Sequence, residues 1–227
     1  MNNINHLALF LGLLTMALAK AASSEEATKV SSLEALPFEL TIEQRNGQVT
    51  ILSSQIEIEA NKGSDLFTNP TGSKNSANVP SVQFFPDGDF IFSAKVSATF
   101  GDSPYDGGAL VVYSDDTTWG KLLFERFKSG KLGVATTVSN PNGDDAYHST
   151  FDNSELYLKI VRHDTSYVFY TSADGSSWNF ARHFDLGVEK NPGIGFIAQS
   201  PLAGSFTATF SDISFRSQRI KDFWQGE

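Results

Sequence analysis

Residues 119–127 combine side chains that suit the binding of a sugar. Successive side chains of an extended strand point to opposite faces, so Trp119, Lys121 and Glu125 share one face. An aromatic ring stacks on the apolar face of a pyranose, and charged groups form hydrogen bonds with its hydroxyls. The alternative is structural: a Lys–Glu pair on a solvated sheet, with Trp119 buried under a loop.

Two further patterns bear on catalysis. Glu57 and Glu59 share a strand face, as a glycosidase's pair of carboxyl groups would require, but alternating glutamates also protect a sheet edge. After the N-terminal segment the only histidines are His148, His163 and His183, and the chain has no Gly-x-Ser-x-Gly motif and no cysteine. We therefore predict no catalytic residue, and keep a glycan-active enzyme as an alternative.

Acidic residues occur as pairs in several expected turns. These pairs are Asp87/Asp89, Asp115/Asp116 and Asp144/Asp145. Carboxylate oxygens on loops suit a structural Ca²⁺, but aspartate is also frequent in turns because its side chain caps the local backbone. None of the pairs has EF-hand spacing, and no histidine spacing suits a transition metal. The sequence predicts no cofactor and no metal ligand, with structural calcium as the alternative.

Short β-strands are the elements that must position these side chains. Residues 90–100 alternate apolar and polar side chains, which is typical of a strand with one buried face. Within residues 119–127, Leu122 and Phe124 form the face that should pack in the core. Further strands are expected at residues 48–52, 55–59, 108–114, 132–138, 156–163, 166–171, 178–184, 194–199 and 206–215. Many short strands separated by turns predict an all-β sandwich or barrel.

Two stretches do not alternate in this way. Residues 61–80 are rich in Asn, Gly and Ser, and we expect them to form an ordered loop over one end of the sandwich. Residues 217–224 could form a short helical turn with Ile220, Phe223 and Trp224 on one face.

The N-terminus carries an apolar run at residues 7–18, followed by small residues including Ala19 and Ala21. This pattern predicts a secretory signal peptide over residues 1–21, because a run of about 12 residues is too short to span a bilayer. A flexible leader is expected at residues 22–37, and one domain at residues 38–227. The predicted location is secreted or periplasmic, with an uncleaved N-terminus on an intracellular protein as the alternative.

Composition limits the partners. The 227 residues include 17 Lys+Arg and 26 Asp+Glu, for a net charge of −9, and 12% are aromatic. Aromatic content at this level favours a folded core, and the acidic balance disfavours nucleic acid and anionic membrane surfaces. We predict no nucleic-acid partner, and no membrane anchor once the signal peptide is cleaved.

An ordered set of motifs resembles a known family. The matching segments are residues 61–67, 89–92, 106–112 followed by Trp119, Lys121 and Glu125, then 158–162, 170–178 and 195–201. Together they resemble the concanavalin A-like domains of the regulator-of-enolase type, a domain of unknown function, over residues 46–217. This resemblance implies a jelly-roll sandwich of two antiparallel sheets, an architecture shared by legume lectins, many glucanases and sugar-binding modules. Fold alone does not assign their function.

One segment departs from that family. Many members have a serine–aspartate–tryptophan cluster where this chain has residues 140–148, which retain the aromatic Tyr147 and its neighbour His148. We add these two residues to Trp119, Lys121 and Glu125 as ligand-binding candidates. The predicted function is a secreted, non-catalytic protein that binds carbohydrate through the outward, concave face of one sheet. The alternatives are a hydrolase or lyase on the same fold, and a protein-interaction domain without a small ligand.

Overall fold

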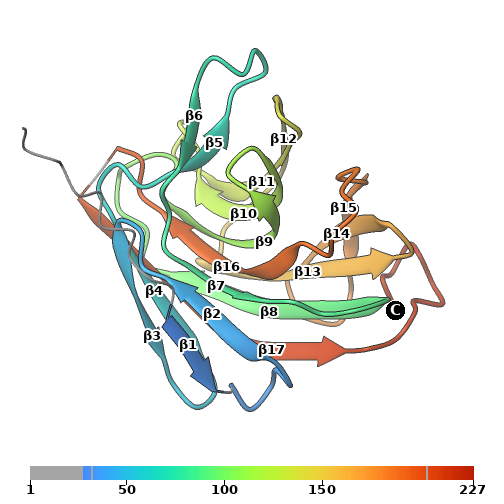
Figure 1. Ribbon diagram of the computed structural model, residues 1–227. Helices are drawn as coiled ribbons and strands as arrows, with labels where there is room; N and C mark the ends of the chain where they lie inside the picture. Colours follow the sequence, from blue (N-terminus) through green and yellow to red (C-terminus); the bar gives the residue numbers. More distant parts are fainter. Residues whose placement is uncertain (1–27, 32, 203) are drawn as a thin grey trace, which may run out of the picture.

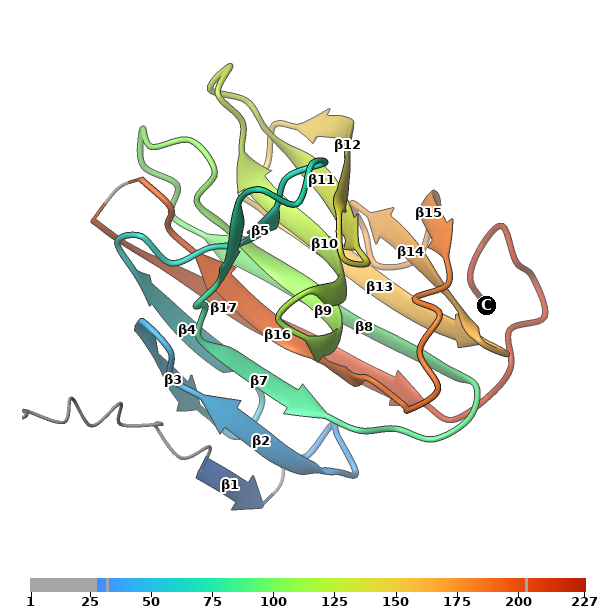
Figure 2. The ribbon, with the colours of Figure 1, turned by 45° about the horizontal axis from the view of Figure 1, so that its top comes forward.

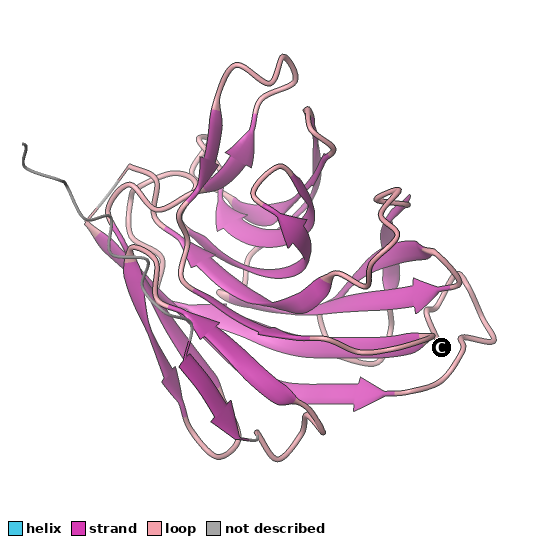
Figure 3. Ribbon diagram, viewed as in Figure 1, coloured by secondary structure: helices cyan, strands magenta, loops and turns pink. Residues whose placement is uncertain are grey.

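The computed structural model describes residues 28–31, 33–202 and 204–227. In these residues the chain forms 17 strands, β1 to β17, and no helix (Figure 3). None of the described segments could therefore cross a membrane as a helix. The signal peptide predicted at residues 1–21 lies outside the described residues.

Two antiparallel sheets form a sandwich, which confirms the predicted fold class (Figure 1). The eight-stranded sheet has the order β1 (Thr28–Ser31), β2 (Glu39–Glu43), β7 (Ser81–Phe84), β16 (Gly193–Gln199), β9 (Gly107–Asp115), β10 (Thr118–Arg126), β11 (Leu132–Ser139) and β12 (Gly143–Phe151). The seven-stranded sheet has the order β15 (Asn179–Phe184), β14 (Ser166–Ser172), β13 (Glu155–His163), β8 (Phe90–Ala98), β17 (Ser205–Arg216), β4 (Ile56–Asn61) and β3 (Gly47–Ile51). A separate hairpin joins β5 (Leu66–Thr68) to β6 (Asn75–Ala77).

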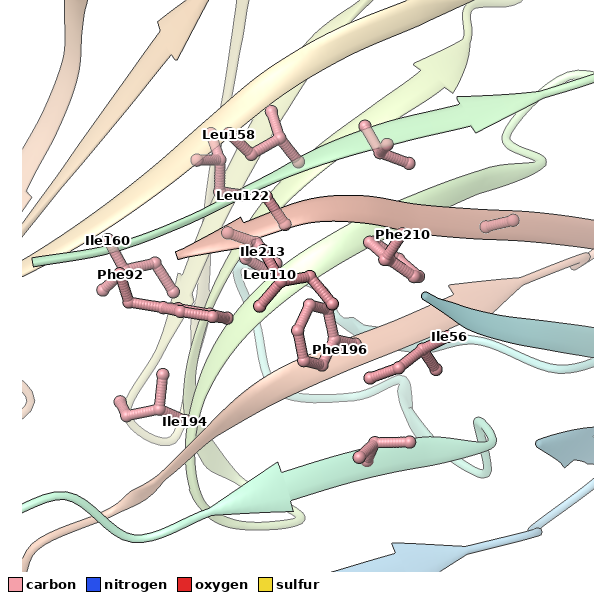
Figure 4. Close-up of a cluster of buried hydrophobic side chains, with 14 of the residues drawn as sticks. Ile56, Phe92, Leu110, Leu122, Leu158, Ile160, Ile194, Phe196, Phe210 and Ile213 are labelled. Atoms are coloured by element: carbon pink, nitrogen blue, oxygen red, sulfur yellow. The ribbon is translucent and has the colours of Figure 1, made fainter. Parts of the chain in front are cut away.

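The main hydrophobic core lies between the two sheets. Phe92 of β8 is fully buried there, as its place in the alternating run predicts. Its ring makes edge contacts with Phe84 and Phe196 at centroid distances of 5.1 and 5.3 Å. Figure 4 shows Phe92 beside Leu110 and Phe196 in this cluster. The alternation in β8 therefore places one row of its side chains inside the sandwich.

Strand β10 is buried on both faces. Leu122 and Phe124 belong to the core between the sheets, as predicted. On the opposite face, Trp119 and Leu123 belong to a second cluster together with Leu66 of β5. The β5–β6 hairpin thus covers part of the outer face of the eight-stranded sheet, and it stands beside β12 in Figures 1 and 2. The loop expected at residues 61–80 contains this hairpin.

A glycine allows the hairpin to pack closely against β12. A Cβ atom on Gly143 would lie 1.7 Å from the carbonyl oxygen of Thr68 in β5, a separation that no side chain allows. The Gly143 amide also donates a hydrogen bond to the carbonyl oxygen of Asn69 at 3.2 Å. The hairpin is thus held to the sheet by backbone contact as well as by apolar packing.

Both ends of the described chain differ from the sequence-based expectation. Strand β1, within the expected flexible leader, pairs with β2, and Leu33 and Leu36 are buried in the main core. The packed domain therefore begins before residue 38. Residues 217–224 form bends and turns and no helical turn: Ile220 and Phe223 pack in a cluster with Tyr170, whereas Trp224 is exposed.

Candidate functional site

A cavity of about 370 Å³ opens on the outer face of the eight-stranded sheet, and we call it the outer pocket. Its floor is made by Lys121 and Glu125 of β10 with Thr137 of β11. The β5–β6 region and β12 form two of its walls, and the residues that follow β16 form a third. Ligand pockets commonly measure about 300–1,000 Å³, so this one suits a small ligand or one end of a larger one.

Lys121 ties the hairpin to the floor of the outer pocket. Its side chain is buried, and its Nζ donates hydrogen bonds to the carbonyl oxygen of Leu66 and, at 2.9 Å, to Oε1 of Gln199. The same Nζ lies 5.6 Å from the centre of the Trp119 ring, within the range of a cation–π interaction. Burial lowers the pKa of Lys121, and the negative charge of Asp65 acts most strongly in the opposite direction.

Glu125 is a buried carboxyl group without a partner. Only 3% of the residue is exposed, and no hydrogen bond or salt bridge joins its carboxyl group to any residue that the structure describes. Burial raises the pKa of Glu125 to about 7, and the positive charge of Lys121 limits that rise. The Glu125 carboxyl group lines the outer pocket, so its oxygens are available to hydrogen-bond donors of a ligand.

Two more acidic side chains line the outer pocket. Asp145 of β12 accepts a hydrogen bond from Oγ1 of Thr137 at 2.5 Å. Asp65, just before β5, is partly buried, and burial raises its pKa, while the positive charges of Lys121 and Lys74 oppose that rise. The pocket therefore combines three carboxyl groups with two amino groups within a small volume.

Aromatic and aliphatic side chains form the rim of the outer pocket. Tyr147 is 62% exposed, and its ring packs edge-on against Phe127 at a centroid distance of 4.9 Å. The centre of the Phe67 ring, from β5, lies 5.3 Å from the Nζ of Lys74, and both residues line the pocket. Leu202 is also exposed at the rim. A ligand in this pocket would meet charged groups at the floor and apolar surfaces at the edge.

Three of the five predicted ligand-binding residues meet in this pocket: Lys121, Glu125 and Tyr147. Trp119 does not, because it is 0% exposed beneath the β5–β6 hairpin. The prediction that its ring stacks on a ligand is corrected, and the structural alternative for this residue holds. The indole Nε1 has no hydrogen-bond partner in the described structure.

His148 also lies outside the outer pocket, so the prediction that it binds the ligand is corrected as well. It follows Tyr147 on β12 and therefore points to the opposite face of the sheet, away from the outer pocket. Its Nε2 shares a hydrogen bond of 2.9 Å with Oγ1 of Thr136. Burial lowers the pKa of His148, and the positive charge of Arg182 adds to that effect.

Several pocket residues were missed by the sequence analysis. Asp65, Phe67, Gln199 and Leu202 reach the pocket only because segments distant in the sequence come together. Asp145 could have been found, since it alternates with Tyr147 and so shares its strand face.

The two residues of the acidic pair Asp115/Asp116 have hydrogen-bond partners within the protein. Asp115 accepts hydrogen bonds from the Thr117 and Thr118 amides, and Asp116 accepts one from Arg45. Among the residues described, no group of three or more His, Asp or Glu side chains could hold a metal ion. Glu57 lies on the other sheet, where it accepts a hydrogen bond from Gln55.

Comparison with known proteins gives a family and a fold. Residues 43–218 match the model of the family described as "Protein of unknown function (DUF1349)". No curated protein sequence matches the chain. A functionally unknown protein from Saccharomyces cerevisiae superposes with a TM-score of 0.71 at 19% identity, over 79% of this chain and 96% of that one.

Two solved structures of carbohydrate-active proteins are also similar. The GH43 protein BlXynB from Bacillus licheniformis has a TM-score of 0.56 at 14% identity, over 78% of this chain but only 39% of that one. A polysaccharide lyase family 18 structure has a TM-score of 0.50 at 12% identity, over 78% of this chain and 93% of that one. At these identities the likeness extends to the β-sandwich fold and no further.

Proposed function

Because this chain belongs to the family described as a protein of unknown function (DUF1349), we propose its function from the site: it binds carbohydrate in the outer pocket, without catalysis. The observation that carries the proposal is that the Glu125 carboxyl, which has no partner among the described residues, and the Lys121 ammonium both lie at the floor of a pocket rimmed by Tyr147. A sugar offers hydroxyl groups to the charged pair and C–H surfaces to the aromatic ring.

The proposal also covers the subtype within the family and the location of the protein. Within the family, the chain is of the regulator-of-enolase type, which the ordered motifs along residues 46–217 support. The protein is secreted or periplasmic, which the apolar run at residues 7–18 supports. Mass spectrometry of the protein from its native source would then find an N-terminus between Ala19 and Ala22, whereas an intact Met1 would contradict export.

A glycan array followed by titration calorimetry tests binding. We expect the Tyr147→Ala variant to lose at least tenfold in affinity for the saccharide that binds best, because aromatic anchors often dominate binding energy. Trp224→Ala is the matched control, since Trp224 is 68% exposed and does not line the outer pocket. It should bind like the parent protein. If no saccharide on the array binds the parent, the proposed function is wrong.

Glu125 also supports a second candidate, a glycan hydrolase. A carboxyl group with a pKa of about 7 retains its proton near neutral pH and could donate it to a leaving glycosidic oxygen. Asp65 and Asp145 line the same pocket and could supply the second carboxylate. Release of reducing ends from an oligosaccharide that binds, lost in Glu125→Gln, would establish this activity in place of simple binding.

A further inference from the structure

We propose that Glu125 and Lys121 make the outer pocket selective for neutral sugars over uronic acids, with the Glu125 carboxylate accepting sugar hydroxyls and Lys121 donating to them. This inference rests on the carbohydrate binding proposed above and adds the substrate class.

The hydrogen-bonding capacity left at the floor points to hydroxyl groups. An ammonium group has three N–H donors, and Lys121 uses two of them, on Leu66 and Gln199. The Glu125 carboxylate has two acceptor oxygens, and neither accepts a hydrogen bond from a described residue. Gln199 already has a partner at each polar atom, because its Oε1 accepts from Lys121 and its Nε2 donates to the carbonyl oxygen of Tyr105 at 2.9 Å. The hydroxyl groups of a sugar both donate and accept, so they complement the unused carboxylate oxygens and the unused N–H.

The charges in the pocket disfavour an acidic ligand. Carboxyl groups of Asp65, Glu125 and Asp145 face amino groups of Lys74 and Lys121. With all five ionised, the lining carries one net negative charge. A uronate carboxylate would be placed near Glu125 in a desolvated site, where like charges repel strongly. A neutral sugar meets no such repulsion, so discrimination comes from the unfavourable contact as well as from the favourable one.

The volume of the outer pocket suits one or two sugar units. At about 370 Å³, the outer pocket lies near the lower end of the range for small-molecule sites. A sugar derivative lacking the relevant hydroxyl would leave Glu125 buried and unpaired, which costs affinity beyond the lost hydrogen bond itself.

The affinity for a neutral sugar should depend on whether Glu125 is ionised. The charged groups that act on Glu125 are Lys121 on its own strand, Asp65 before β5, Asp145 on β12 and Asp106 before β9. The carboxylate accepts stronger hydrogen bonds from hydroxyls than the protonated acid does. Because burial raises the pKa of Glu125 to about 7, affinity for a neutral sugar should fall as the pH drops below that value.

The experiment compares the full-length parent with Glu125→Gln, which has the shape of the protonated acid. Calorimetric titrations use neutral disaccharides (cellobiose, xylobiose, maltose and mannobiose) and digalacturonate, at about pH 8.5 and about pH 5.5. At the higher pH, Glu125→Gln should bind the best neutral disaccharide about tenfold more weakly than the parent. At the lower pH the two affinities should converge, because the parent is then protonated as well. Glu59→Gln, a half-buried glutamate of β4 remote from the pocket, is the control and should match the parent.

The possible failures are distinguishable. Binding of digalacturonate as tight as that of the neutral disaccharides overturns the selectivity and leaves carbohydrate binding intact. Equal affinities of the parent and Glu125→Gln at high pH also overturn it, provided that their melting temperatures show both are folded. If neither class of saccharide binds the parent, the proposed function itself fails.

Discussion

Replacement of Trp119 by alanine separates the structural role of this residue from a role in binding. The indole is 0% exposed and packs with Leu66 of the β5–β6 hairpin and Leu123 of β10. It also lies 5.6 Å below the ammonium group of Lys121. Trp119→Ala should therefore create a cavity between the hairpin and the sheet.

The size of the effect follows from the buried area. A tryptophan side chain buries about 150–250 Å², and at about 25 cal/mol per Å² this burial is worth about 4–6 kcal/mol. Because the surroundings relax in part and the Cβ atom remains, we expect a loss of about 3–5 kcal/mol in the free energy of unfolding for Trp119→Ala. For a domain of this length, that loss lowers the melting temperature by about 6–20 °C.

Thermal and urea unfolding measure the loss directly, and Trp119→Phe is the matched control. Phenylalanine keeps a ring in the cavity and removes only the smaller part of the indole, including Nε1, which has no hydrogen-bond partner among the described residues. Its destabilisation should be clearly smaller than that of alanine. A Trp119→Ala protein that melts with the parent but no longer binds sugar would refute this reasoning, because that result requires an exposed, ligand-stacking indole.

Two further predictions concern the hairpin and the pocket carboxyl. Gly143→Ala should force the hairpin away from β12, because its Cβ would lie 1.7 Å from the Thr68 carbonyl oxygen. We therefore expect a lower melting temperature and weaker sugar binding. Gly101→Ala is the control and should change neither, because the space around Gly101 is open. An unshifted melting temperature for Gly143→Ala would contradict this packing. Glu125 holds its proton more tightly in the folded protein than in the unfolded chain, so its contribution to stability is present below about pH 4.5 and is lost as the pH rises through about 7. Glu125→Gln cannot ionise and should lose less stability between about pH 5 and about pH 8; identical pH profiles of urea unfolding would count against the raised pKa.

Local geometry explains why much of the fold was predictable. Side chains alternate across any strand, so Leu122 and Phe124 could be placed in the core and Lys121 and Glu125 on the outer face without knowledge of the partner strands. The same rule placed Phe92 between the sheets. The direction of each side chain follows from the alternation between residues two positions apart, which is visible in the sequence itself.

The candidate site was only partly predictable, because each side chain's exposure depends on distant segments. The sequence by itself determined that Trp119, Lys121 and Glu125 share one face of β10. Only the tertiary structure decided that the hairpin, which supplies Leu66 at a separation of 55 residues from Lys121, covers Trp119 and leaves Glu125 at a cavity. A strand pattern specifies which way a side chain points, whereas burial depends on what folds over it, and that contact has no local signature.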